Sequence, residues 1–197
     1  HGVHRRQRQM CIRDSPLTVE YLQDNMVIGF FSVLWIAILL SMMLATEDFF
    51  IEDFNDGSLE QTIIKSNSFS VFIVTKTFTY WLLIGIPISI LSFVFSLGTS
   101  ENMTLSFLIL PLSMISSYIF LHLFVLGNAL SLNKGSVLGA LVTMPMALPV
   151  LIVLGKSVTA IQVEINYMGF VYLLLGCLSI IMAVSYTHLT LPTMYTV

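Results

Sequence analysis

Long apolar runs separated by short polar connections dominate the chain. The runs cover residues 26–45, 77–97, 105–130, 137–154 and 168–183, and none contains Asp, Glu, Lys or Arg. About 20 apolar residues are enough for a helix to cross a bilayer, whereas one charge at mid-helix costs about 2.5 to 3.5 kcal/mol on insertion scales. The pattern therefore predicts an all-α fold, a polytopic bundle of transmembrane helices.

The segment 47–66, between the first two runs, has a different pattern. It crowds together the carboxylates of Glu47, Asp48, Glu52, Asp53, Asp56 and Glu60. Phe50 and Phe54 are spaced i, i+4 and so share one stripe of a helix, with carboxylates elsewhere around it. This spacing predicts a short amphipathic helix lying at the membrane surface.

A turn and a second helix are predicted directly after it. Asp56-Gly57 favours a turn that a helix interior would penalise. Ser58-Leu59-Glu60-Gln61 has the spacing of a capping box, in which the Ser58 hydroxyl accepts from the Gln61 amide and the Gln61 side chain reaches back. The segment is thus predicted to run helix, sharp turn, helix.

Composition and charge set the environment and the orientation. Only 10% of the residues are charged, 56% are hydrophobic and the mean hydropathy is +0.91, which is unlike a soluble domain. Placing the acidic segment in the cytoplasm puts Lys65, Lys76 and Lys134 inside and only Lys156 outside. Basic residues favour the cytoplasmic side, so this orientation is expected.

The two ends of the chain are interpreted as artefacts. "RRQRQMCIRD" (5–14) and "VSYTHLTLPT" (184–193) can be translated from the two strands of one DNA string, with a match at every position, as in a sequencing adapter. Residues 1–15 and 184–197 are therefore set aside, and 16–183 is taken as a permease-like membrane domain of a fragment. Without the basic N-terminus, no nucleic-acid or metal site is predicted, and the acids of 47–66 are expected to lack a cationic partner within the chain.

The chain carries no sign of its own catalytic machinery. The phosphate-binding pattern G-x-x-x-x-G-K-[ST] is absent from the sequence, and the apolar runs contain no paired carboxylates. Energy for any transport must then come from a partner. An acidic surface beside negative lipid would be repelled, so a basic protein partner for 47–66 is expected.

At this point the residues resemble a known family. The run "DGSLEQ" (56–61), then Lys76, and the run "WLLIGIP" (81–87) are similar to the signature of the CcmB family of cytochrome c maturation permeases, with Tyr80 where the family often has His. "LNKGSVLG" (132–139) and the Pro145/Pro149 helix after it are similar to a later family segment, although Asn133-Lys134 replaces two adjacent basic residues. Similarity of this kind covers most of residues 26–155.

The resemblance implies a function and partners. It implies an ABC-2-type permease of the bacterial inner membrane, with six spans of which this chain has five. It also implies a separate CcmA-like ATPase, a CcmC-like haem-handling protein, a CcmE-like haem chaperone and a permease homodimer. ATP would act only through the ATPase, and haem would be the handled ligand, either exported or released with its chaperone. The alternative is a permease of another ABC-2 exporter, for a drug, a lipid or a polysaccharide.

Candidate residues follow from these arguments. The expected site of ATPase coupling consists of Asp53, Asp56, Gly57, Ser58, Leu59, Glu60 and Gln61. Gly85, Pro87, Pro145 and Pro149 are expected to serve helix packing or kinks, and Gly135 and Gly139 have a small-xxx-small packing spacing. His122 is a candidate haem ligand, with a histidine hydrogen-bonded between helices as the alternative. No cofactor is assigned to the chain itself.

Overall fold

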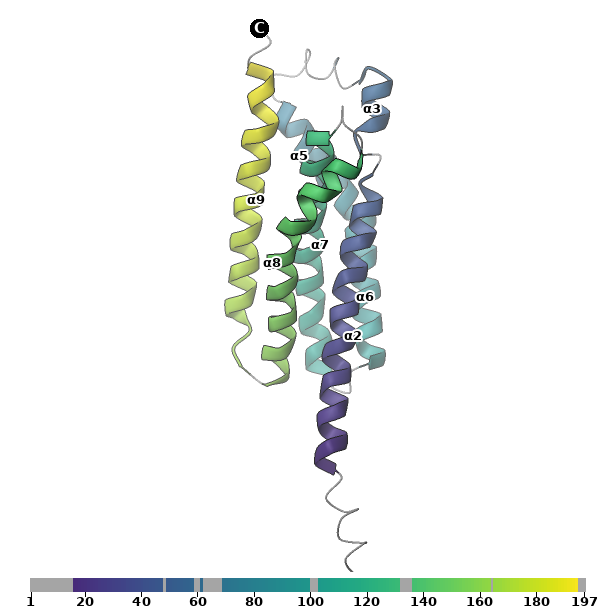
Figure 1. Ribbon diagram of the computed structural model, residues 1–197, viewed down its shortest axis with the longest axis vertical. Helices are drawn as coiled ribbons and strands as arrows, with labels where there is room; N and C mark the ends of the chain where they lie inside the picture. Colours follow the sequence, from purple (N-terminus) through teal and green to yellow (C-terminus); the bar gives the residue numbers. More distant parts are fainter. Residues whose placement is uncertain are drawn as a thin grey trace, which may run out of the picture.

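The fold is a bundle of helices, seen in a computed structural model of the chain that describes residues 16–47, 49–58, 61, 69–99, 103–131, 136–163 and 165–194 (Figure 1). Every regular element in these ranges is helical, as the sequence predicts. The elements are α2 (Pro16–Ala45), α3 (Ile51–Asn55), α5 (Phe69–Tyr80), the π-helical turn η1 (Trp81–Gly85), α6 (Ile86–Thr99), α7 (Met103–Ser131), α8 (Ser136–Gln162) and α9 (Met168–Met194).

Five stretches of the described helices are long and apolar enough to cross a membrane. They are Met26–Ala45, Val71–Thr99, Met103–Leu130, Leu141–Gln162 and Met168–Ser185. The first, third and fifth agree closely with the predicted runs. The second begins earlier than predicted, because α5, η1 and α6 follow one another without a break.

The predicted end of the fourth span at residue 154 is too early. The polar residues after it resemble a connection, but α8 continues to Gln162. Val158 and Ile161 are buried against the bundle, and the Ser157 hydroxyl donates to the Leu154 carbonyl at 2.7 Å. A hydroxyl bonded within its own helix is compatible with an apolar environment, so the helix persists.

Helix α7 is the centre of the bundle. Two-thirds (67%) of its membrane window is buried, against 17–33% for the other four spans, and every residue from 119 to 127 is buried. It packs on α2, α6, α8 and α9, which surround it in Figure 1. On α2, the side chains of Phe31, Trp35, Ile38 and Met42 recur at helical spacing and are buried in the core that these helices share.

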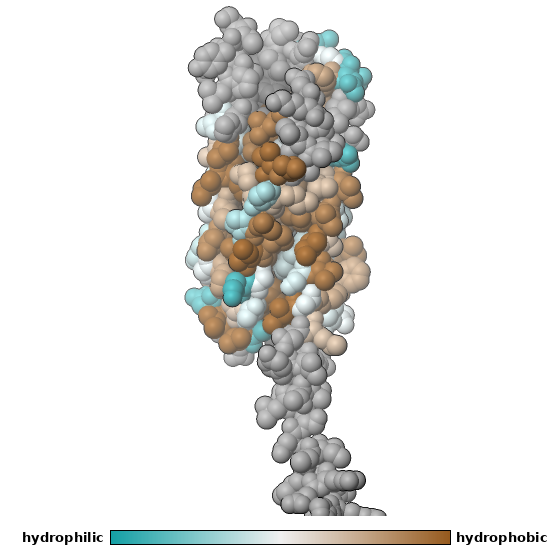
Figure 2. All heavy atoms as spheres, viewed as in Figure 1, coloured by the Kyte–Doolittle hydropathy of each residue, from teal (hydrophilic) through white to brown (hydrophobic). Residues whose placement is uncertain are grey.

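The outward faces of the surrounding helices are apolar. Large side chains such as Leu83, Leu141, Ile152 and Tyr172 are 63–70% exposed. Figure 2 shows such residues covering the middle of the molecule, with hydrophilic residues gathered over α3 at its upper right. An exposed apolar belt of this extent is what lipid would cover.

Helices α7 and α8 lie close together at Gly127 and Gly139. A Cβ on Gly127 would lie 2.4 Å from Thr143 Cγ2 and 2.8 Å from the Gly139 carbonyl oxygen. The expected packing role of Gly139 is therefore seen against Gly127, which the sequence analysis did not single out. Gly135 lies outside the described residues.

Candidate functional site

The acidic segment lies at one end of the bundle, where α3 stands beyond the C-terminal end of α2 (Figure 1). Asp56 and Ser58 are exposed there, and Asp53 is partly buried. Leu59 and Glu60, predicted members of the same site, lie outside the described residues. The predicted site thus has at least one carboxylate open to a partner.

Gly57 makes the sharp turn that the sequence predicts. Its φ is +69°, in the left-handed region that favours glycine, and its amide donates to the Phe54 carbonyl at 3.4 Å. Beyond it, the Gln61 amide donates to the Gly57 carbonyl at 3.3 Å, whereas the Ser58 hydroxyl donates to the Asp53 carbonyl at 3.2 Å. The first bond of the next helical turn therefore starts one residue earlier than the predicted capping box.

The aromatic residues of this segment are arranged differently from the prediction. Phe49 and Phe50 are only 1% and 2% exposed, and Phe49 meets the Tyr80 ring edge-on at 4.7 Å between centroids. Phe54 is the exposed member of the predicted stripe, at 45%. The segment is thus inserted into the bundle by Phe49 and Phe50, which corrects the prediction of a helix merely lying on the membrane surface.

Lys76 of α5 binds this segment at several points. Its ammonium donates to the Asp53 carboxylate and, at 2.7 Å, to the Phe49 carbonyl. The same Nζ lies 4.7 Å from the Phe49 ring centroid, within the range of a cation–π interaction. The expectation that the acids lack a cationic partner within the chain is therefore wrong for Asp53.

A second anchor comes from the central helix. The Asn128 side-chain amide of α7 donates to the carbonyl of Thr46, the residue that follows α2. Thr46 is fully buried, and its hydroxyl bonds the carbonyls of Met42 and Met43, both at 3.0 Å. The start of the acidic segment is thereby fixed to α7, while its middle is fixed to α5.

The π-helical turn η1 follows α5 directly, and Pro87 explains its position. The Ile86 amide donates to the Trp81 carbonyl, five residues back. Proline has no amide hydrogen and its ring collides with the carbonyl four residues earlier, here that of Leu83. A wider π turn before the proline relieves that collision, and such turns are frequent at functional sites.

The Trp81 indole is held across this turn. A Cβ on Gly85 would lie 2.4 Å from Trp81 Cδ1, so the indole occupies the space that the glycine leaves. Its Nε1 donates to the Ser117 hydroxyl of α7 at 3.1 Å. Gly85 and Pro87 therefore lie at one packing feature, the widened turn with its indole against α7.

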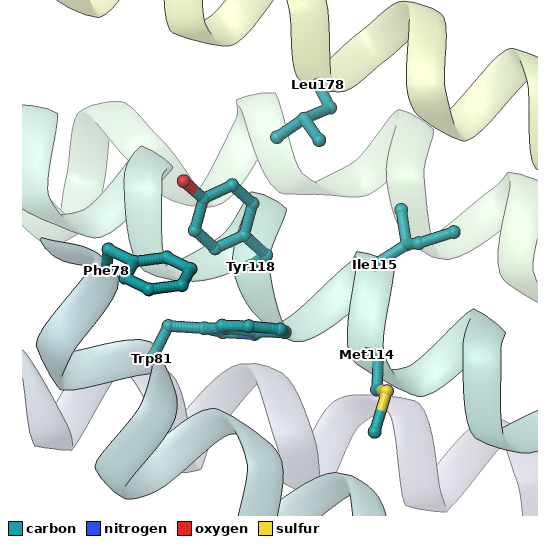
Figure 3. A pocket seen from close by; sticks show the side chains of 6 residues that line it. All are labelled: Phe78, Trp81, Met114, Ile115, Tyr118 and Leu178. Carbon is teal, nitrogen blue, oxygen red and sulfur yellow. The ribbon is translucent and has the colours of Figure 1, made fainter. Parts of the chain in front are cut away.

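A pocket of about 310 Å³ opens beside the indole, between α5, η1, α7 and α9. Its lining consists of Phe78, Trp81, Met114, Ile115, Tyr118 and Leu178. Figure 3 shows the rings of Phe78, Trp81 and Tyr118 on one side and Leu178 reaching toward them from α9. The lining is almost wholly apolar, so the pocket belongs to the membrane part of the bundle.

His122 is enclosed in the interior of the bundle, where it is 5% exposed. Its Nδ1 lies 3.1 Å from the Tyr118 carbonyl and so carries the proton in that bond, and its ring meets Tyr118 edge-on at 4.3 Å. The residue does not line the pocket beside Trp81. The bond joins two residues of α7 itself, which differs from the hydrogen bond between helices expected as the alternative, and haem ligation by His122 stays a prediction.

The remaining candidates are spread through the structure. Pro145 and Pro149 are exposed within α8, which changes direction along its length in Figure 1. Among the described residues, no group of three or more His, Cys, Asp or Glu side chains could hold a metal ion. Sequence reasoning missed Asn128, Ser117 and the pairing of Lys76, because each partner is distant in the chain. The one signal available for Lys76 was its position just before an otherwise charge-free run.

Comparisons with known proteins agree with the predicted family. The model of the family described as CcmB protein matches residues 25–190. The chain is 31% identical over 139 residues to heme exporter protein B of Haemophilus influenzae, covering 70% of this chain and 63% of that protein. It is also 30% identical over 122 residues to heme exporter protein B of Pseudomonas aeruginosa, covering 61% of this chain and 55% of the relative.

A third relative gives a shorter match. Heme exporter protein B of Escherichia coli K12 is 38% identical over 60 residues, which are 30% of this chain and 27% of that protein. The chain thus spans less than two-thirds of the length of each of these three relatives. The family model covers most of the chain, and with it the acidic segment, the π turn and all five apolar spans, so the chain belongs to the CcmB family.

Proposed function

We propose that this chain is part of the permease subunit of an ABC-type complex for cytochrome c maturation in the bacterial inner membrane. A separate ATPase subunit supplies the energy, which is used to export haem or to release the haem-loaded chaperone. Relatives named heme exporter protein B support haem over the other exported substrates considered above. A homodimer of the permease, with CcmC-like and CcmE-like partners, completes the proposed complex.

One observation carries the coupling part of this proposal, namely the exposed acidic face of the segment around Asp56. This face lies at one end of the bundle, beyond the apolar belt, and the segment behind it is fixed by buried side chains (Figures 1 and 2). A charged surface that is already ordered can bind a basic groove without the entropic cost of ordering. Such a surface can also transmit the movement of its partner to the helices behind it. The exposed acids are proposed to dock on the ATPase at the cytoplasmic face.

Charge reversal of the exposed Asp56, together with Glu60 of the predicted site, tests the docking. The double variant Asp56→Lys/Glu60→Lys leaves Asp53 and its ion pair untouched. We expect it to lower ATPase retention on membranes by at least about tenfold, because truncating or reversing interface charges costs a few kcal/mol. Retention is measured by co-purification of the ATPase with the complete permease.

A matched control is available at the other end of the bundle. For the matching single change, Asp56→Lys, the control is Glu101→Lys in the connection between α6 and α7, which should leave ATPase retention unchanged. If the double variant retains the ATPase as well as the control does, the acidic face is not the docking surface.

A further inference from the structure

Lys76 occupies the one described point at which the acidic segment and α5 are joined by charge. Its side chain is 19% exposed and that of Asp53 is 26% exposed, so the ion pair is largely shielded from water. Shielding strengthens the attraction and reduces screening by salt. Any movement of α3 therefore stretches or compresses the ion pair between Lys76 and Asp53.

The contacts of Lys76 reach both parts of the segment. The carboxylate belongs to Asp53 in α3, whereas the carbonyl that accepts from Lys76 and the nearest ring belong to Phe49, which lies before α3. The Phe49 ring also packs on Tyr80, one turn after Lys76 in α5. Lys76 and Tyr80 together form the face of α5 that contacts the acidic segment.

This face leads directly into the π turn. Tyr80 is the last residue of α5, and Trp81, the first of η1, is bonded to Ser117 of α7. Displacement of α5 along its axis would therefore act on η1, and through the indole on the pocket walls that Phe78, Trp81 and Tyr118 form. The other anchor, between Thr46 and Asn128, holds the start of the segment to α7 and gives α3 a fixed point about which to move.

We propose that Lys76 is a positioning residue that, through its ion pair with Asp53, transmits movement of the acidic segment to the π turn Trp81–Gly85 and so to the membrane pocket beside it. The inference rests on the proposed function, since the ATPase supplies the movement. It assigns Asp53 and Asp56 different tasks. Asp56 faces the partner, whereas Asp53 faces Lys76.

The test uses the complete permease assembled with its ATPase, in cells that lack their own permease. Lys76→Gln removes the charge but keeps a polar side chain. We expect the ATPase to be retained as in the wild type, while formation of holocytochrome c falls by about tenfold, within the 5–150-fold range typical of coupling between sites. Lys156→Gln, at an exposed lysine of α8, is the matched control and should leave both quantities unchanged.

Exchange of the two charges separates transmission from mere stability. The double variant Asp53→Lys/Lys76→Asp restores an ion pair with reversed ends but not the contacts of Lys76 with Phe49, and we expect it to recover part of the holocytochrome c that Lys76→Gln loses. If Lys76→Gln does not accumulate in the membrane, Asp53→Asn replaces it in the same comparison. A rescue of function at equal protein level would not arise from a residue that only supports folding.

A spectroscopic measurement follows the movement itself. This chain has two tryptophans, so Trp35→Phe, with any tryptophan elsewhere in the complete permease also replaced by Phe, leaves Trp81 as the reporter when the permease carries 5-fluorotryptophan and the ATPase is unlabelled. Trapping the complex with ATP and vanadate should shift the Trp81 fluorine resonance in the presence of Lys76 and not in Lys76→Gln.

Each contrary result has one meaning. Unchanged holocytochrome c in Lys76→Gln, or a failed charge exchange at normal protein level, overturns the transmission role. Loss of the ATPase from Lys76→Gln would place Lys76 in docking and also overturn it. Failure of the proposed function is seen separately, as an ATPase that does not bind even the wild-type permease.

Discussion

The position of the Trp81 indole depends on the absence of a Cβ at Gly85. The Gly85 Cα lies against the Trp81 indole, whose Nε1 bonds Ser117, and Ser89 in the next turn donates to the Gly85 carbonyl at 2.7 Å. The sequence motif "WLLIGIP" is therefore a packing motif in physical terms.

Gly85→Ala should destabilise the protein. The added Cβ would force the indole away from its place, and overpacking of this kind costs about 1 to 3 kcal/mol. The measurement is the thermal unfolding midpoint of the purified protein in detergent, together with Trp81 fluorescence. Gly98→Ala in α6 is the control, because nothing lies within 4 Å of its added Cβ. Equal midpoints for the two variants would contradict the packing role.

The sequence predicts residue roles well where they depend on near neighbours. The turn at Gly57 follows from Asp56-Gly57 alone and is confirmed by its positive φ. The pairing of Asp53 with Lys76 does not follow from the sequence, because it depends on how α3 and α5 meet in space. The burial of Phe49 and Phe50 was missed for the same reason, since a helical stripe does not reveal whether lipid or protein covers it.

At the scale of elements, the absence of charged residues predicts where the membrane spans lie, but it does not predict where each span ends. Hydropathy places the five membrane helices but ends the fourth at residue 154, because polar residues that bond within a helix look like a loop. The π turn is also hidden from hydropathy. It results from Pro87 acting on the carbonyl of Leu83, inside a run that is apolar throughout.

The contact of α7 with α8 should be sensitive to one methyl group. Gly127→Ala would place its Cβ 2.4 Å from Thr143 Cγ2, so we expect the two helices to be pushed apart and the unfolding midpoint to fall. Adding Thr143→Ser removes that methyl and should recover part of the loss, although the Gly139 carbonyl remains close. If the effects of the two changes simply add, the helices do not meet at this point.

At the scale of the whole molecule, the two ends of the bundle differ in chemistry. The end with α3 carries the exposed acids, whereas the other end has the connections between α6 and α7 and between α8 and α9 (Figure 1). Basic residues are too few for orientation to rest on them alone. The orientation thus stays a prediction, which labelling can test.

Single cysteines at the two ends report the orientation. Asn55 and Asn166 are both exposed, and Cys177 and any other cysteine of the complete permease are first replaced by Ser. A maleimide that does not cross membranes should label Asn55→Cys only in inverted vesicles and Asn166→Cys only in intact spheroplasts. The reverse pattern would place the acidic segment outside the cell and would contradict its coupling to an ATPase.

The π turn also bears on how related sequences align. A π turn is an α-helix with one residue inserted, and the insertion is absorbed locally rather than rotating everything after it. Pro87 is the residue that requires the wider turn. A relative without that proline could therefore lack one residue between positions 81 and 85 and still present Lys76 to the acidic segment and Ser89 to α7. A one-residue gap between positions 81 and 85 would then be an expected variation within the family. Relatives that have this gap should also lack the proline at position 87.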